Sequence, residues 1–197
     1  MNWDRVNVWT NTLYTLIHSL NLSKQIYFGN LSTIAESVTN AGKWLTPECS
    51  YQSVLIVHPF GNSRVTFRRD PNKHFDEIAN QLLKMLIQDL VVILDEMMSE
   101  VILARSLPAP NYPQSKIAQL KRYLPAKYEW AAFGCLELVA ARNVLTHNGG
   151  RWNAKSIAIV SPFISPAPTS GEKLMIGLPM LFRYRKAMRT FLNEVKP

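Results

Sequence analysis

The sequence predicts a mainly α-helical protein with small β-hairpin additions. Long stretches in which apolar residues recur at spacings of three and four, with no internal proline, predict the helices. Short β-branched runs on either side of turn-rich segments predict the hairpins. The chain has 197 residues, of which 47% are hydrophobic and 18% charged, so it can bury a core. Because no linker rich in proline, glycine or serine divides it, we expect a single domain over residues 1–197.

The first 70 residues are expected to form helices and a β-hairpin that elaborate a helical core. Apolar residues keep a helical spacing over Trp3–Leu20 and again over Leu31–Leu45, which Pro47 ends. The β-branched runs Ser53–His58 and Arg64–Arg69 flank a Pro-Phe-Gly-Asn turn, and this arrangement predicts a hairpin.

The helical core is expected over residues 74–197. Its longest helix is predicted over Phe75–Leu103, which has no internal glycine or proline and whose methionines are expected to fill gaps in the core. A proline-rich connector and a short basic helix lead to a further helix over Lys127–His147, which Gly149 and Gly150 end. The apolar face predicted for this helix consists of Trp130, Phe133, Leu136, Ala140 and Val144.

The C-terminal part is expected to begin with two short strands and to end in a helix. Ser156–Val160 and Lys173–Gly177 look like strands joined by a proline-rich loop. Pro179 begins the last helix, whose basic residues lie away from its apolar face. The residues predicted to face inward are Leu181, Tyr184, Met188, Phe191 and Val195.

Charge is distributed unevenly along the chain. Residues 1–100 hold 8 Lys+Arg against 10 Asp+Glu, a balance of −2, whereas residues 101–197 hold 14 against 4, a balance of +10, and the net charge is +8. Segregated positive charge attracts a polyanion, and nucleic acid is the commonest one inside cells. Membrane lipid, an acidic protein and a merely solubilising surface are the alternatives, so charge alone names no ligand.

Several classes of protein are excluded by what the sequence lacks. Cys49 and Cys135 are too few for a disulfide framework and do not have the spacing of a zinc site. The N-terminal residues lack the pattern of a signal peptide, and no apolar stretch reaches the roughly 20 residues of a membrane span. No nucleophile elbow or phosphate-binding glycine loop is present. We therefore expect a cytoplasmic protein that uses no metal or cofactor and does not bind a membrane.

The most informative segment lies at the end of the helix predicted over Lys127–His147, where Arg142 is followed by Asn143 and, five residues after the arginine, by His147. A permanently charged guanidinium can stabilise a phosphorane, and histidine, which titrates near neutral pH, can move the proton of a 2′-hydroxyl. These groups suffice to cleave RNA without a metal. The alternative is a surface arginine and a helix-capping histidine with no chemistry.

A second pair with the same spacing occurs at Arg69 and His74. Pro71 places that pair in a loop before a helix rather than at the end of one. We therefore single out Arg142 and His147.

The segment from Arg142 to His147 resembles the motif of ribonucleases of the HEPN superfamily, the higher eukaryotes and prokaryotes nucleotide-binding domains. In that motif an arginine is followed by a polar residue and, after four to six intervening residues, by a histidine. The resemblance continues through the Asn-Gly-Gly stop, the two short strands and the basic last helix, and it covers Lys127–Val195.

This resemblance implies an antiparallel helical bundle, HEPN-like in fold, and a homodimer with a composite active site. It implies a metal-independent endoribonuclease in which Arg142, Asn143 and His147 are catalytic and the products end in a 2′,3′-cyclic phosphate and a 5′-hydroxyl. It also implies a toxin or phage-defence effector restrained by an antitoxin or another neighbouring-gene partner. The tyrosine that follows the histidine in one HEPN subgroup is absent here, which argues against regulation by its modification.

Residues around the motif are weaker candidates. Asn148 is expected to contact phosphate or to cap the helix, and Arg151 and Trp152 to hold RNA by charge and stacking, with packing of the tryptophan as the alternative. Glu137 either orients Arg142 or forms an ion pair between helices. The competing function is a non-catalytic HEPN-like module that binds RNA, a nucleotide or another protein.

Overall fold

The structure, a computed structural model, describes residues 3–24, 71–147 and 149–197. The helix predicted over Leu31–Leu45 and the hairpin of the first 70 residues lie outside these ranges. The described residues are mainly α-helical, as predicted, and none of them belongs to a β-strand. The helices are α1 (Asp4–Lys24), α4 (Pro71–Ala104), α5 (Pro113–Lys121), α6 (Glu129–His147), α7 (Ala154–Val160) and α8 (Leu178–Val195), with a 3-10 turn over Ala126–Tyr128.

The chain divides into two compact units, Met1–Leu16 with Ala79–Pro197 and, separately, Ile17–Ile78. The second unit is described only at the end of α1 and the beginning of α4. The first unit contains the remaining helices, and the core and the site described below lie within it. No helix in the described ranges is long and apolar enough to cross a membrane.

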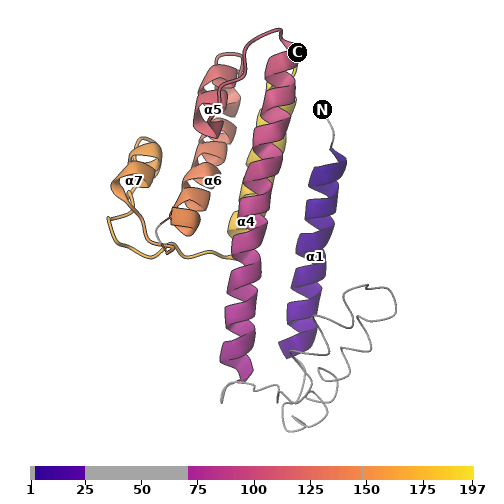
Figure 1. Ribbon diagram of the computed structural model, residues 1–197, viewed down its shortest axis with the longest axis vertical. Coiled ribbons are helices and arrows are strands. Elements are labelled where there is room, and N and C mark those ends of the chain that lie inside the picture. Colours follow the sequence, from indigo (N-terminus) through magenta and orange to yellow (C-terminus); the bar gives the residue numbers. More distant parts are fainter. Residues whose placement is uncertain (1–2, 25–70, 148) are drawn as a thin grey trace, which may run out of the picture. The chain divides into compact units, whose positions relative to one another are not determined.

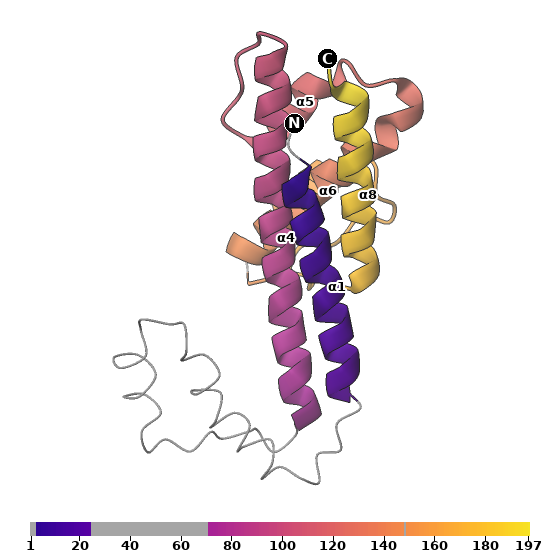
Figure 2. The ribbon, with the colours of Figure 1, turned by 90° about the vertical axis from the view of Figure 1, so that its right-hand side faces the viewer.

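In the first unit, α1, α4, α6 and α8 pack lengthwise, and α1 and α6 run opposite to α4 and α8 (Figures 1 and 2). Trp9 of α1 is buried, and its indole Nε1 donates a hydrogen bond of 2.9 Å to the carbonyl oxygen of Leu86. The long helix α4 confirms the helix predicted over Phe75–Leu103, and its Met97 and Met98 are buried as expected. Met85 was predicted to lie in the core and is instead exposed.

The last helix, α8, buries all five residues predicted to face inward. It packs closely against α6 at Gly134, where an added Cβ would lie 2.5 Å from the Cβ of Ala187. Small side chains let the two helix backbones approach, which explains why alanines dominate the buried face of α6. This face consists of Ala131, Ala132, Cys135, Leu138, Val139, Ala140, Ala141 and Val144.

The predicted apolar face of α6 is therefore partly wrong. Ala140 and Val144 are buried, but Phe133 and Leu136 are half-buried and Trp130 is exposed. The prediction followed the largest apolar side chains, whereas the close contact at Gly134 selects the face with the smallest ones. Helix α6 packs against α5, α7 and α8, so its buried residues point in several directions, and Trp130 remains exposed.

The two strands predicted in the C-terminal part are also wrong. Ser156–Val160 belongs to helix α7, which Asn153 caps by accepting a hydrogen bond of 2.8 Å from the backbone N–H of Ser156. Ser156 and Val160, four residues apart, are both buried, as expected for one face of a helix. This burial and the N-cap favour a helix although the segment is rich in β-branched residues. In Lys173–Gly177 only an isolated antiparallel bridge from Lys173 to Arg151 forms.

Candidate active site

The end of α6 is fixed by the two glycines and by the segment that follows them. Gly149 and Gly150 have φ values of 59° and 80°, in the left-handed region that glycine adopts readily. The Gly150 N–H donates to the carbonyl oxygen of Val144 (3.2 Å), and the Leu174 N–H donates to that of Gly150 (2.8 Å). These hydrogen bonds hold the chain where α6 stops, and so they hold the last turn, which carries His147.

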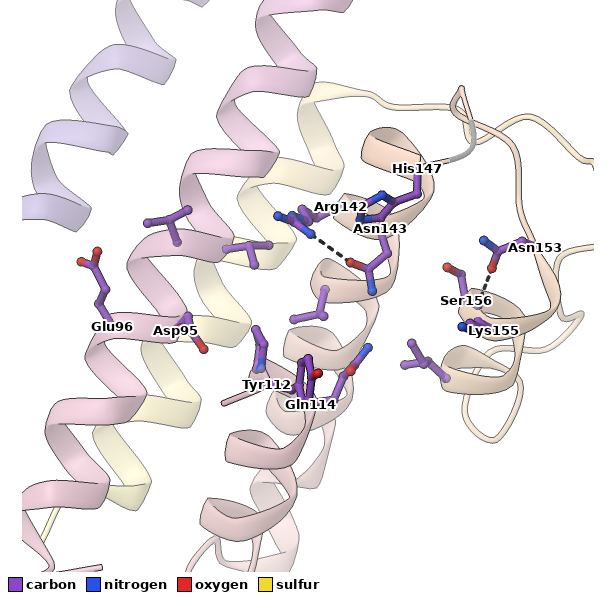
Figure 3. A pocket seen from close by; sticks show the side chains of 15 residues that line it. Asp95, Glu96, Tyr112, Gln114, Arg142, Asn143, His147, Asn153, Lys155 and Ser156 are labelled. Carbon is purple, nitrogen blue, oxygen red and sulfur yellow. Dashed lines mark hydrogen bonds between the residues drawn. The ribbon is translucent and has the colours of Figure 1, made fainter. Parts of the chain in front are cut away.

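A groove of about 710 Å³ lies between the last turns of α6 and the neighbouring helices α4, α5 and α7 (Figure 3). Arg142, Asn143 and His147 all line this groove, so the structure brings the three predicted catalytic residues to one surface. The other residues that line it are Val91, Val92, Asp95, Glu96, Tyr112, Pro113, Gln114, Val139, Asn153, Lys155, Ser156 and Ile159.

Arg142 and Asn143 are half-buried and joined by a hydrogen bond, in which Nη1 of the arginine donates to Oδ1 of the asparagine at 3.3 Å (Figure 3). This bond occupies the acceptor of the asparagine and leaves its amide N–H groups available as donors. The guanidinium retains further N–H groups, since it has five in all. The pair therefore offers several donors and a permanent positive charge to an anion in the groove.

The acidic residues of the groove are neutralised by cations outside it. Asp95 of α4 forms an ion pair of 2.8 Å with Lys116 of α5, a buried lysine that also donates to Ser99. Glu96 forms an ion pair with Arg5 of α1. Arg142 and Lys155 form no ion pair within the described part of the chain, so the groove presents net positive charge to a ligand.

Helix α7 contributes residues that sequence reasoning missed. Lys155 is exposed on the groove, and Asn153 and Ser156 line the wall that faces α6 (Figure 3). They were missed because Ser156–Val160 was predicted to be a strand, which would place these side chains differently. The signal that could have identified the helix is the N-cap, an asparagine followed by Ala-Lys-Ser.

Tyr112 and Gln114, at the beginning of α5, line another part of the groove. Tyr112 retains 70% of its surface, so its ring is accessible to a ligand. An exposed aromatic ring beside cations can stack on an unpaired base. Nothing in the local sequence of Tyr112 indicates this role.

The remaining predicted site residues lie away from the groove or outside the described residues. Trp152 is 8% exposed and its ring is packed in the core, so the packing alternative holds. Arg151 is exposed, and its Nη1 donates to the carbonyl oxygen of Gly171 (2.9 Å). Glu137 forms an ion pair with Arg183 of α8, which is the inter-helix alternative. Asn148 is not among the described residues.

Other reactive groups of the unit do not face the groove. Cys135 is buried, and burial raises the pKa of its thiol far above the ordinary range, which keeps it protonated and unreactive. Within the described residues, no three His, Cys, Asp or Glu side chains gather as metal ligands would. The groups that line the groove include the imidazole of His147, the cations of Arg142 and Lys155, and several side-chain amides.

Comparison of this chain with family models, curated proteins and solved structures gave no match.

Proposed function

We propose that this protein is a metal-independent endoribonuclease of HEPN type, acting as a toxin or phage-defence effector. The observation that carries the proposal is that Arg142, Asn143 and His147 meet in one positively charged groove. The resemblance of this segment to the HEPN motif supports the same reaction.

In the proposed reaction, His147 takes the proton from the 2′-hydroxyl of RNA, and the oxygen attacks the adjacent phosphorus. The bond from phosphorus to the 5′-oxygen then breaks, which leaves a 2′,3′-cyclic phosphate and a 5′-hydroxyl. Arg142 neutralises the charge that develops on the phosphorane, Lys155 holds a phosphate of the bound RNA, and the amide of Asn143 donates to a phosphoryl oxygen. The exposed positions of His147 and Lys155 leave room for a substrate to reach both.

The leaving 5′-oxygen needs a proton, and a single groove holds one histidine in its wall. In the homodimer implied by the resemblance, His147 of the second copy supplies that proton, while the first copy holds the proton it removed. One imidazole then acts as the general base and the other as the general acid.

A second candidate is a non-catalytic module that binds RNA. The observation in its favour is that the His147 side chain makes no hydrogen bond with another described side chain, whereas a catalytic imidazole is often oriented by such a partner. This module would use the same cations and the exposed ring of Tyr112, and His147 would not affect the integrity of bound RNA.

The two functions are separated by incubating the purified protein with mixed RNA in excess EDTA and mapping the ends of any fragments. We expect cleavage with cyclic-phosphate ends, abolished by His147→Ala. The matched control is His18→Ala, which removes an exposed histidine from α1, outside the groove, and should leave cleavage intact. RNA bound but uncut by the folded, dimeric protein would support the second candidate.

A further inference from the structure

A face of α6 outside the groove carries an exposed aromatic ring beside a cation. Trp130 retains 43% of its surface, although tryptophan is usually well buried in folded proteins. Lys186 of α8 places Nζ 5.7 Å from the centroid of the Trp130 ring. At 3.6 residues per turn, Trp130 and Glu137 share one face of α6, and Arg142 lies about 120° away around the helix. This side of the helix therefore forms a surface distinct from the groove.

We define the α6–α8 basic surface as Trp130, with Lys186 beside its ring, and three cations near it in the sequence or on the adjoining helices, Lys121, Lys127 and Arg183. Two of these cations have acidic partners, since Lys121 forms an ion pair with Glu129 and Arg183 with Glu137. Lys127 and Lys186 have no such partner among the described residues, so the surface is net positive.

Two of these cations lie over aromatic rings of their own. Lys121 Nζ lies 4.6 Å from the centroid of Phe133, and Lys127 Nζ lies 4.8 Å from that of Tyr128. Phe133 in turn stacks on Phe163, with centroids 4.7 Å apart and planes at 9°. These contacts hold the flexible lysine side chains beside rigid rings, so part of the entropy cost of ordering them is met before a ligand arrives.

A polyanion with accessible flat bases is the ligand that complements such a surface. Single-stranded nucleic acids bind proteins by placing phosphates beside lysines and stacking bases on exposed aromatic rings, whereas a duplex hides the faces of its bases. An acidic protein would satisfy the charges and leave the Trp130 ring without a flat partner.

We infer that the α6–α8 basic surface binds single-stranded RNA, with a base stacked on Trp130 and phosphates beside Lys127 and Lys186. The choice of RNA over other single-stranded polyanions rests on the proposed function. Trp130 and Arg142 are about 18 Å apart along the helix axis, at 1.5 Å per residue, and about 120° apart around it. A dinucleotide therefore occupies the groove without reaching this surface, and only a longer RNA gains affinity from both.

The stacking is tested with the full-length His147→Ala protein, which leaves RNA intact, and a fluorescent single-stranded RNA of about 12 nucleotides, within the usual range of site sizes. Trp130→Ala should weaken binding about tenfold, and Trp130→Phe should weaken it less because a ring remains. The matched control is Tyr14→Ala, which removes an aromatic residue of similar exposure, 45%, from α1. It should leave affinity unchanged.

The charges are tested by the salt dependence of the same binding. Each of Lys127→Gln and Lys186→Gln should reduce the slope of log affinity against log salt concentration by about 0.7, as expected for one phosphate contact with a single strand. Lys173→Gln, which removes an exposed lysine away from this surface, should not change the slope.

Failure of this inference differs from failure of the proposed function. In the protein with native His147, Trp130→Ala should leave cleavage of a dinucleotide unchanged. If the unsubstituted protein cleaves no RNA at all, only the proposed function is overturned. Equal affinity of the Trp130→Ala and Tyr14→Ala proteins for the RNA overturns the inference. Equal binding of an RNA duplex of the same length, or displacement of the RNA by poly-glutamate at equal charge, also overturns it.

Discussion

The two ends of α6 present different chemistry to solvent. Its last turns place Arg142 and His147 in a groove, beside amides and Lys155. Its first turns place the exposed ring of Trp130 beside Lys186, outside the groove. Both ends are positively charged, and the difference lies in the neighbours of the cations.

The two ends of α6 are therefore suited to different tasks. Amides and an imidazole around a cation can donate, accept and transfer protons, which a reaction at phosphorus requires. Aromatic rings around a cation offer stacking area and no proton transfer, which favours holding a flexible ligand. Substitutions at the two ends should therefore separate the rate of cleavage from the affinity for long RNA.

After His147→Ala, the largest effect is expected from Arg142→Ala. Loss of the guanidinium should lower the rate of dinucleotide cleavage about 10²- to 10³-fold, since it removes charge stabilisation of the phosphorane. Arg142→Lys should restore only part of the rate because lysine is a point charge without the planar donor set. Single-turnover kinetics measure both, with Arg151→Ala as the control for an exposed arginine outside the groove. A change in affinity with an unchanged rate would contradict the assignment.

Gly134→Ala should damage the end of α6 that carries Trp130. The new Cβ would lie 2.5 Å from Ala187 Cβ, so α6 and α8 must move apart, and we expect a loss of about 1–3 kcal/mol in the free energy of unfolding. RNA affinity should fall with it because Trp130 and Lys186 separate. Gly177→Ala is the matched control, since its Cβ would meet Pro179 at an ordinary 3.5 Å. Denaturant unfolding monitored by circular dichroism measures the stabilities of the Gly134→Ala and Gly177→Ala proteins. Equal stabilities would contradict close packing at Gly134.

The helices could be predicted from the sequence where apolar residues form a stripe of large side chains. In α8 the predicted positions, such as Phe191, are buried, and in α4 Met97 and Met98 are buried as predicted. In α6 the pattern pointed to Trp130, because sequence periodicity registers large residues and does not show that a neighbouring helix demands small ones. That demand comes from tertiary contact with Ala187.

The site shows the same division between local and tertiary information. Arg142 and His147 were predicted together because they belong to one local motif at the end of one helix, and the structure places both in the groove. Lys155 was missed because it belongs to a short helix after a loop, and the β-branched residues of this segment predicted a strand instead. For Trp152, stacking on RNA and packing in the core were both left open, because the exposure of a single loop residue cannot be read from its local sequence, and the structure buries it.

A smaller effect is expected from Lys155→Ala, which tests the groove at its α7 wall. Loss of one charged contact to a phosphate should raise KM about tenfold and leave the rate with bound substrate within a few-fold. Raised salt should reduce the difference between the two proteins. Lys173→Ala, at an exposed lysine outside the groove, should behave as the unsubstituted protein. An unchanged KM for Lys155→Ala would remove α7 from the site.

The smallest effect concerns the contact that joins α6 and α8 between the two ends. The Tyr184 hydroxyl donates to Glu137 Oε1 at 3.0 Å, and Arg183 also contacts this carboxylate. Burial first, and then the charge of Glu137, raise the pKa of Tyr184 well above its ordinary value. At neutral pH, Tyr184→Phe should cost about 1 kcal/mol through the lost hydrogen bond.

The pH dependence of this cost follows from the direction of the pKa shift. Tyrosine in the unfolded chain loses its proton above about pH 10, while the folded protein keeps Tyr184 protonated, so unfolding releases a proton there. As the pH rises above about 10, the free energy of unfolding of the native sequence should therefore fall by up to about 1.4 kcal/mol per pH unit more than that of Tyr184→Phe. The stabilities of the two proteins should converge. The buried Cys135 contributes equally to both proteins and cancels in the difference. Urea unfolding from about pH 8 to about pH 11 measures this convergence, and parallel curves would show that Tyr184 ionises as readily in the folded protein as in the unfolded chain.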